Sequence, residues 1–274
     1  MIADLHSHST ASDGELTPEQ LLSRAKEQGV ELMAITDHDT LAGYCSVDTA
    51  AFAPMTVISG IELSCVWGKT TIHVVGLNVD VTHKPLLAGV EQQAQARHKR
   101  AIMIAEKLEK KGFTGAYEAT VAMAAGRSIG RPDFARFLVD NGYVATMDAA
   151  FKRYLGSGKI GDVKMMWPEL ATAVQWIKGS GGVAVLAHPL HYKMTNTKLR
   201  ALVADFQRAG GQAIEVMSGK QQNDRIDYLA KLADQFSLHA SIGSDYHGPN
   251  YSWCELGAMG TLPKSCRPVW ELFA

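Results

Sequence analysis

The sequence has no excess of charge of either sign. Its 274 residues include 27 Lys and Arg against 28 Asp and Glu, a formal net charge of -1. A protein that holds the phosphate backbone of long duplex nucleic acid usually carries a basic excess. The composition therefore argues against long duplex nucleic acid as a partner, and it leaves open a small anionic ligand held by a few placed groups.

Long apolar runs are missing as well. No apolar stretch approaches the length of about 20 residues that a helix needs to cross a bilayer, so we expect no membrane association. The first ten residues, MIADLHSHST, lack a basic start followed by an apolar run, and no signal peptide is predicted. Cytoplasmic localisation is the default expectation.

Cysteine is scarce and scattered. The four cysteines are Cys45, Cys65, Cys254 and Cys266, and no two of them form a C-x-x-C pair. Free thiols in a reducing compartment are the simpler interpretation. Internal repeats and low-complexity tracts are not evident either, which argues against a repeat architecture.

Short apolar runs alternate with helical patterns along most of the chain. Hydrophobic residues make up 46% and charged residues 20%, enough for an ordinary core. The strand-sized runs are Ile2 to His6, Leu32 to Thr36, Thr56 to Leu63, Ile72 to Val79, Gly182 to Ala187, Ala213 to Met217 and Ala240 to Ser244. Helices are predicted from Pro18, over about 84–110, and from near Pro168, Lys198 and Gln221. The alternation predicts an α/β protein.

Two departures from strict alternation define the predicted organisation. The third and fourth runs are separated only by residues 65–71, too few for a crossover helix, so that pair is predicted to be antiparallel. Residues 111–167 are rich in Ala and Gly with helical patches, and are predicted to form a small helical insertion that caps the substrate. Residues 1–110 and 168–274 would then form the main domain.

Polar residues of the metal-binding type lie at or just beyond the end of nearly every apolar run. His73 instead lies at the start of its run, as expected if that strand runs the other way. Only the C-terminal face of a barrel would gather residues so scattered in sequence into one pocket. The candidates are His6, His8, Asp13, His38, Glu62, His73, His188, Asp245 and His247.

Each motif also has an ordinary structural interpretation when taken alone. His6 and His8 are two apart and can share one face of a strand, yet a pair of surface histidines is an equal alternative. Asp13 lies in an Asp-Gly turn, where turn chemistry is sufficient. In Asp37-His38-Asp39, His38 is the candidate ligand, and the two aspartates are interpreted as caps of the following helix.

The remaining motifs strengthen one another. Glu62 ends an apolar run, where a carboxylate needs a cation or a partner, and His73 on the adjacent run is within reach. Six histidines and three carboxylates at strand termini together predict a metal site. Histidine and carboxylate ligands suit Mn²⁺, Zn²⁺ or Fe²⁺. Nine ligands predict two or three ions, and closely spaced ions activate a hydroxide for attack at phosphorus.

These motifs resemble the PHP family, named for polymerase and histidinol phosphatase. The matching pieces are DLHSHSTASDG, AITDHDTLAGY, SGIELS, HVVGLNV, VAVLAHP and IGSDYHG. The resemblance implies a distorted (β/α)7 barrel with three metal ions at its C-terminal face. It assigns His6, His8, Glu62 and Asp245 to one metal, Glu62, His73 and His188 to a second, and Asp13, His38 and His247 to a third. Some family members have His in place of Asp13.

The segment Gly-Arg-Pro-Asp-Phe-Ala at 130–135 looks like that of stand-alone PHP phosphoesterases acting on nucleotides. The substrates that this resemblance implies are nucleoside 3′,5′-bisphosphates, losing the 3′-phosphate, or short 5′-phosphorylated RNA degraded from its 5′ end. Mn²⁺ is the metal we expect first, and Zn²⁺, Fe²⁺ or Mg²⁺ remain open. A non-catalytic metal-binding module is a further hypothesis, although no ligand is missing here. The sequence does not determine the oligomeric state.

A second set of residues is predicted to contact substrate. Arg131, next to a predicted helix start at Pro132, would clamp phosphate. His191, three residues after His188, would contact phosphate or protonate the leaving oxygen. Solvent-exposed roles are equal alternatives for both. The residues after the sixth run at the same barrel face complete the set: Ser218, Lys220 and Asn223.

Overall fold

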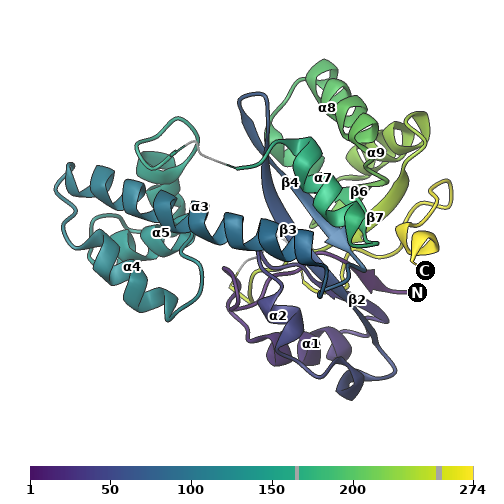
Figure 1. Cartoon of the computed structure of the whole chain (residues 1–274), viewed down its shortest axis with the longest axis horizontal. Helices are drawn as coiled ribbons and strands as arrows, with labels where there is room; N and C mark the ends of the chain where they lie inside the picture. Colours follow the sequence, from purple (N-terminus) through teal and green to yellow (C-terminus); the bar gives the residue numbers. More distant parts are fainter. Residues whose placement is uncertain (164–166, 251–254, 274) are drawn as a thin grey trace. The chain divides into compact units, whose positions relative to one another are not determined.

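Seven strands form one sheet in the computed structural model of the chain, in the order β1-β2-β3-β4-β5-β6-β7 (Figure 1). The structure describes residues 1–163, 167–250 and 255–273. The strands are Ala3–Asp4 (β1), Leu32–Ile35 (β2), Thr56–Trp67 (β3), Thr70–Leu77 (β4), Val183–Leu186 (β5), Ala213–Ser218 (β6) and His239–Gly243 (β7). All seven predicted strands are present, and the predicted α/β class is confirmed.

The sheet nearly closes on itself, because the first and last strands meet. The amide of Leu5 donates to the carbonyl of Ile242 (3.0 Å), and the amide of Asp245 donates to the carbonyl of His6 (2.9 Å). The strand ends that carry the candidate ligands therefore lie around one rim. This confirms the predicted distorted (β/α)7 barrel.

One strand runs against the others and distorts the barrel. β4 pairs antiparallel with both β3 and β5, whereas β1–β2, β2–β3, β5–β6 and β6–β7 are parallel. The predicted antiparallel pair is confirmed, with a turn at residues 68–69. In its register His73 lies opposite Ser64, near the carboxyl half of β3. The reversed strand thus brings its starting residues to the rim where the parallel strands end.

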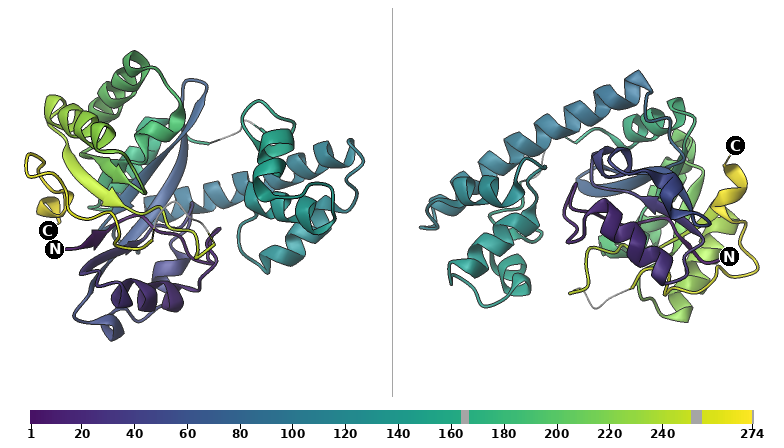
Figure 2. Two further views of the ribbon diagram at one scale, coloured as in Figure 1. Left: turned by 180° about the vertical axis from the view of Figure 1, so that it is seen from behind. Right: turned by 90° about the horizontal axis from the view of Figure 1, so that it is seen from below.

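The helices are α1 (Pro18–Glu27), α2 (Ala42–Cys45), α3 (Lys84–Glu109), α4 (Ala116–Ala124), α5 (Arg131–Asp140), α6 (Met147–Ala150), α7 (Leu170–Gly179), α8 (Asn196–Ala209) and α9 (Asn223–Gln235), with short turns η1 (Thr49–Phe52), η2 (Phe151–Leu155), η3 (Pro189–Tyr192) and η4 (Val269–Leu272). Helices of the barrel unit, among them α1, α7, α8 and α9, lie outside the strands, and α4, α5 and α6 belong to a separate helical unit. Figure 2 shows α1 and α2, in purple, on one side of the strands and α8 and α9, in green, on the other. α1 begins as predicted, with Pro18 in its first turn and a capping box between Thr17 and Gln20.

The chain divides into two compact units. The barrel unit comprises Met1–Val90 and Trp167–Ala274, and the helical unit comprises Glu91–Met166. The helical unit starts at Glu91 and not at residue 111 as expected, because most of α3, from Glu91 to Glu109, belongs to it. Ala101, Ile104 and Leu108 of α3 are buried in one cluster with Phe134 of α5.

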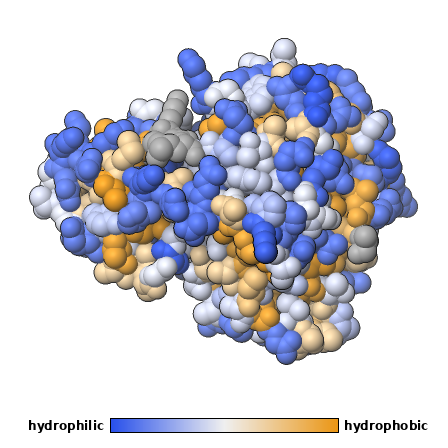
Figure 3. All heavy atoms as spheres, viewed as in Figure 1, coloured by the Kyte–Doolittle hydropathy of each residue, from blue (hydrophilic) through white to orange (hydrophobic). Residues whose placement is uncertain are grey.

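The surface of the molecule is mixed in character. In Figure 3, hydrophilic side chains cover most of the face drawn, and hydrophobic ones lie scattered between them. Large exposed hydrophobic residues include Leu87, Met103 and Val121.

Cys45, Cys65 and Cys266 are free thiols, and Cys254 lies outside the described residues. Within the described ranges, the helices are too short or too polar to cross a membrane.

Candidate metal centre

Two fully buried histidines follow β1. Ser7 between them is tied to β2 and its end: its amide donates to Thr36 Oγ1 (3.0 Å) and its hydroxyl to the carbonyl of Ala34 (2.9 Å). Because side chains alternate along an extended chain, anchoring Ser7 on one side turns His6 and His8 together to the other. Their ring centroids are 5.1 Å apart.

The fully buried carboxylate of Glu62 lies at the centre of the candidate residues. Its Oε1 lies 2.9 Å from both His73 Nδ1 and His188 Nε2, and its Oε2 lies 2.7 Å from His38 Nδ1. Each oxygen also approaches a histidine of the β1 end, His6 Nε2 at 3.3 Å and His8 Nε2 at 3.5 Å. One carboxylate thus faces imidazoles from several strands, the geometry of a ligand shared between two ions.

The residues after β7 bring a second carboxylate to the same rim. Asp245 Oδ1 lies 3.3 Å from His8 Nε2 and 3.6 Å from His6 Nε2. His247 Nδ1 lies 2.8 Å from the carbonyl oxygen of Asp245. A carbonyl only accepts, so this nitrogen is the donor.

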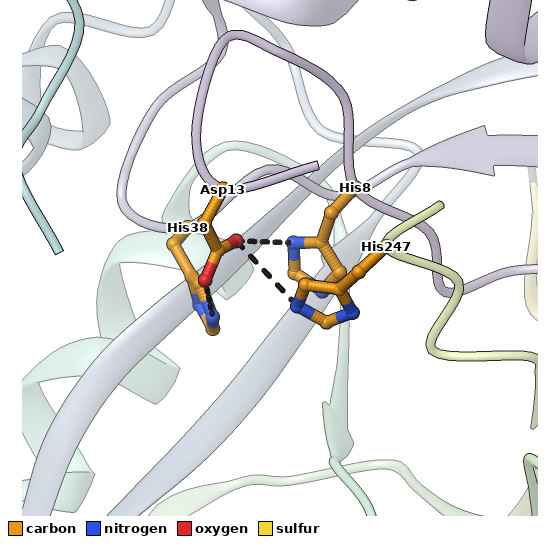
Figure 4. A group of neighbouring side chains, drawn as sticks. All are labelled: His8, Asp13, His38 and His247. Carbon is orange, nitrogen blue, oxygen red and sulfur yellow. Dashed lines mark ion pairs between the residues drawn. The ribbon is translucent and has the colours of Figure 1, made fainter. Parts of the chain in front are cut away.

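Asp13 gathers the third group of side chains. Its Oδ1 lies 3.5 Å from His247 Nε2 and 3.8 Å from His8 Nδ1, and its Oδ2 lies 3.7 Å from His38 Nε2. Figure 4 shows the three imidazoles facing this one carboxylate. The turn that carries Asp13 therefore faces the barrel rim.

The donor set fits divalent cations. His6 Nε2 and both ring nitrogens of His8 are buried and have no hydrogen-bond partner among the described residues. Buried polar atoms left in this state are costly, and a cation accepting their lone pairs removes the cost. The groups whose ligand atoms lie within 4.8 Å of one another are His8–Asp13–His38–His247, His6–Glu62–His188, His6–His8–Asp245 and His38–Glu62–His73. The structure thus brings all nine candidates together, while the ion that each one serves stays a prediction.

The electrostatics of the cluster suit metal binding. Burial opposes the charge of Glu62, but the neighbouring His73 and His38 outweigh it and hold the pKa of Glu62 well below its usual range. Burial, followed by the nearby His247 and His38, lowers the pKa of His8 to about 3. Metals bind ionised carboxylates and neutral imidazoles, the forms that these two shifts favour. For His188 the shift is opposite: burial lowers its pKa, but the hydrogen bond and charge of Glu62 outweigh burial and raise it.

One residue of the site is missing from the sequence-based predictions. Glu215 is buried in β6, with Oε1 2.6 Å from His6 Nδ1, and its Oε2 accepts from the amide of His188 (2.5 Å). Burial opposes charge on His6, but Glu215 and then Glu62 outweigh it and raise the pKa of His6 well above its usual value. A carboxylate on the far nitrogen of a ligating histidine fixes its orientation. The signal was available: Glu215, like Glu62, is a carboxylate inside an apolar strand.

The interpretation of Asp37 and Asp39 as helix caps is wrong. Asp37 accepts from the amide and hydroxyl of Ser9 (2.8 and 2.6 Å) and from the hydroxyl of Ser12 (2.6 Å), which fixes the turn before Asp13. Asp39 accepts from the amide of Ser64 in β3 (2.6 Å). Both carboxylates therefore hold loops of the site in place.

The backbone is strained at three points of the rim. Asp39, His188 and Asp245 have φ values of 56°, 26° and 55°, a region that residues other than glycine rarely adopt. Such strain persists where the surrounding structure enforces it, and it concentrates at functional sites. Here it accompanies the strand ends that carry the candidate ligands.

Of the predicted substrate residues, His191 lies beside the cluster. It is in η3, and its ring stacks on His188 with centroids 5.1 Å apart. Ser218 ends β6, and its buried hydroxyl has no hydrogen-bond partner among the residues described. Lys220 is exposed in the loop that follows, and Asn223 is the first residue of α9. His191 follows β5, and Lys220 and Asn223 follow β6, whereas Ser218 is the last residue of β6 and does not follow it; contact of these residues with substrate stays a prediction.

Arg131 belongs to the helical unit. It is the first residue of α5, so Pro132 is the second helical residue and not the first. Arg131 Nη1 donates to the carbonyl of Leu155 (3.3 Å). A role for Arg131 at the barrel rim stays a prediction.

A nearly closed seven-stranded barrel with histidines and carboxylates gathered at its rim defines a metal-binding α/β barrel protein. Residues 4–157 match the PHP domain, and the chain belongs to the PHP domain family. It is 45% identical over 271 residues to a 5′-3′ exoribonuclease of Haemophilus influenzae, with 98% of each chain covered. It is 41% identical over 270 residues to a 3′,5′-nucleoside bisphosphate phosphatase of Chromobacterium violaceum, covering 98% of this chain and 95% of that one.

A solved structure agrees over almost the whole chain. It is that of an amidohydrolase from Chromobacterium violaceum with bound sulfate and no metal. The TM-score is 0.92 at 41% identity, covering 99% of this chain and 96% of that one. The similarity extends across both units of the chain.

Proposed function

We propose that this chain, a PHP-family metal-dependent phosphoesterase, removes the 3′-phosphate from nucleoside 3′,5′-bisphosphates and leaves nucleoside 5′-monophosphates. The buried cluster around Glu62 carries the proposal, since it offers ligands for two or three divalent ions at one rim. The 41% identity to a bisphosphate phosphatase supports the substrate. Mn²⁺ is the metal that we test first.

Bound divalent ions would polarise a phosphoryl oxygen and lower the pKa of an attacking water. The chain's own residues have separate tasks. Glu62, His6 and His188 would hold the ions, while Glu215 keeps His6 oriented. His191, stacked on His188, would contact a phosphate oxygen or deliver a proton to the leaving oxygen. Arg131 would clamp phosphate through its guanidinium.

A second activity is supported by a different relative. The 45% identity to a 5′-3′ exoribonuclease favours stepwise hydrolysis of short 5′-phosphorylated RNA. A phosphomonoester and a phosphodiester differ by one substituent on phosphorus, so the same cluster would serve both reactions. We propose short RNA as an alternative substrate of the same site.

Purified protein incubated with Mn²⁺ and adenosine 3′,5′-bisphosphate tests the first activity by release of phosphate. A labelled 5′-phosphorylated oligoribonucleotide tests the second by the appearance of mononucleotides. Zn²⁺ and Mg²⁺ in parallel reactions identify the metal. If neither substrate nor a wider nucleotide panel reacts with any metal, the proposed function is wrong.

The non-catalytic alternative has its own signature. If the metal is only structural, chelation lowers the thermal stability of the protein, and no enzymatic activity is lost with the metal. Metal analysis, thermal unfolding and phosphate release on one chelated and reconstituted sample separate the two cases.

A further inference from the structure

A cavity of about 590 Å³ lies beside the carboxyl end of β6. It is open to solvent and is lined by the end of β6, the loop and first turns of α9, and part of the segment 255–263. The described residues that line this cavity do not include any of the nine candidate metal ligands. Pockets of 300–1,000 Å³ are of the size that holds small ligands.

The cavity begins next to the strand ends that carry the cluster. Ser218 pairs with Gly243, and the amide of Gly219, a wall residue, donates to the carbonyl of Gly243 (2.9 Å). Asp245, whose carboxylate lies 3.3 Å from His8 Nε2, follows two residues later. Adjacent strands lie about 5 Å apart and two residues span about 7 Å at most, so the wall starts within roughly 12 Å of Asp245.

The cavity has an apolar floor and a polar rim. Met217, Ile226 and Met259 form apolar wall and pack against the barrel core. Lys220 and Asp227 are exposed at the rim. Thioethers pack well against flat aromatic rings, and the ammonium group attracts phosphate. An apolar floor of this kind suits a heterocyclic base. Lys220 is the cation among the described residues that line the cavity and suits a phosphate, while the carboxylates of Asp227 and Glu255 suit sugar hydroxyl groups, which donate hydrogen bonds.

We propose that this cavity binds the nucleoside part of the substrate, with the base against Met217 and Met259 and Lys220 near the phosphate that is not cleaved. This inference rests on the proposed function and adds a specificity site to it. The metal cluster acts on the scissile phosphate, and the cavity selects nucleotides over simple phosphate esters.

Two variants block the cavity at different points. Met259→Arg places a long cation over the floor, and Thr261→Trp fills the space from an exposed wall position. Met103→Arg is the matched control, because Met103 is exposed on α3 in the helical unit. Metal content and Tm, measured for each variant, identify any that fails to fold, and the other blocking variant then decides.

Three readouts follow. We expect the KM for adenosine 3′,5′-bisphosphate and the Kd for adenosine 5′-monophosphate, measured by calorimetry, to rise at least tenfold in both blocking variants. Hydrolysis of p-nitrophenyl phosphate, which has no nucleoside, should change less than twofold, as should all values for Met103→Arg. Unchanged KM and Kd in a folded blocking variant would overturn the proposal, and so would an equal loss of p-nitrophenyl phosphate hydrolysis.

The two levels of proposal fail separately. If the wild-type protein hydrolyses no nucleotide, the proposed function is wrong, and the calorimetric Kd still tests the cavity. If the wild type is active and the blocking variants match it, only the cavity assignment is wrong.

Discussion

The barrel unit and the helical unit handle charge in opposite ways. The barrel unit has 14 Lys and Arg against 20 Asp and Glu, a net charge of -6, while the helical unit has 13 against 8, a net charge of +5. The near-neutral whole is the sum of an acidic and a basic part. Divalent cations would offset the acidic excess of the barrel, and the basic unit suits an anionic substrate.

The two units also bury charge for different purposes. In the barrel, Glu62 and Glu215 are buried against imidazoles, and His6 lies between the two carboxylates, with Nδ1 toward Glu215 and Nε2 toward Glu62. In the helical unit, the buried Asp133 is fully engaged: Arg127 donates to both of its oxygens (2.5 and 3.0 Å), and the amide of Gly130 donates as well (2.7 Å). The charge of Asp133 is balanced by Arg127 within the helical unit, whereas bound cations would balance the carboxylates of the barrel cluster.

Replacing the central carboxylate should have the largest effect. Glu62→Ala removes a ligand oriented between imidazoles on both sides, and we expect activity to fall by on the order of 10³-fold, since metal ions supply several kcal/mol to such reactions. Phosphate release and metal content measured together check this. The same change at the exposed Glu109 of the helical unit is the control. Full activity in Glu62→Ala would show that the bridging role is wrong.

Breaking the helical pair should act on stability alone. Arg127→Ala leaves the carboxylate of Asp133, 7% exposed, without its main partner, which should cost about 2–3 kcal/mol. Denaturant unfolding measures the loss, and hydrogen exchange locates it in α5. Metal content should stay that of the wild type, with the exposed Arg153→Ala as control. Loss of metal would contradict the separation of the two units.

Glu215 should be a positioning residue and not a ligand. Glu215→Gln keeps the shape but loses the charge beside His6, and such partners typically contribute about 10–100-fold in metal affinity or activity. A metal titration measures the loss in metal affinity, and kcat, measured separately, gives the loss in activity. Glu215→Asp should restore part of the loss in metal affinity, which a purely structural role of the side chain would not predict.

Removing the proposed phosphate clamp, Arg131 of the helical unit, should change the kinetics with substrate and leave the metal content unchanged. Arg131→Ala should raise KM or lower kcat by about tenfold with metal content retained, because a guanidinium forms charge-assisted bonds to phosphate. Arg131→Lys should recover only part, since an ammonium lacks the fork geometry. Wild-type kinetics in Arg131→Ala would restrict the active site to the barrel.

The sequence was sufficient for much of the site because the signal is local. Eight of the nine candidate ligands end or follow an apolar run, or start the reversed one, and a barrel brings such ends together whatever lies between them. Asp13 lies in a turn, and its prediction rested on the family resemblance. The role of Asp39 was missed because its partner Ser64 lies on β3, and only the register of the strands brings the two together. Glu215 and His6 are 209 positions apart, so their contact depends on closure of the barrel.

The unit boundary could not be predicted for a different reason. α3 is one continuous helix from Lys84 to Glu109, and local pattern gives no sign of where its packing partners change. The change at Glu91 depends on Phe134 and its neighbours, which come later in the chain. Local pattern defines the helix, whereas tertiary packing decides which unit each part of it joins.

The smallest effect concerns an ion pair of the barrel that is not part of the cluster. Arg24 Nε and Nη2 donate to Glu255 (2.9 and 2.5 Å), and this contact lowers the pKa of Glu255 below its ordinary 4.5. Both side chains are 33% exposed, so the pair should contribute less than about 1 kcal/mol, compared with the larger value for Arg127 and Asp133.

The lowered pKa determines the pH at which this contribution disappears. It is fully present above the unfolded-state pKa near 4.5 and is lost as the pH falls through the lower folded-state value. We therefore expect Glu255→Gln to lower the Tm by about 3 °C or less at pH 7, and the difference from wild type to shrink below pH 4.5. Arg24→Gln and the double variant complete a cycle that isolates the pair from the protonation of other carboxylates. A difference that grew on acidification would mean that Glu255 gains nothing from its arginine.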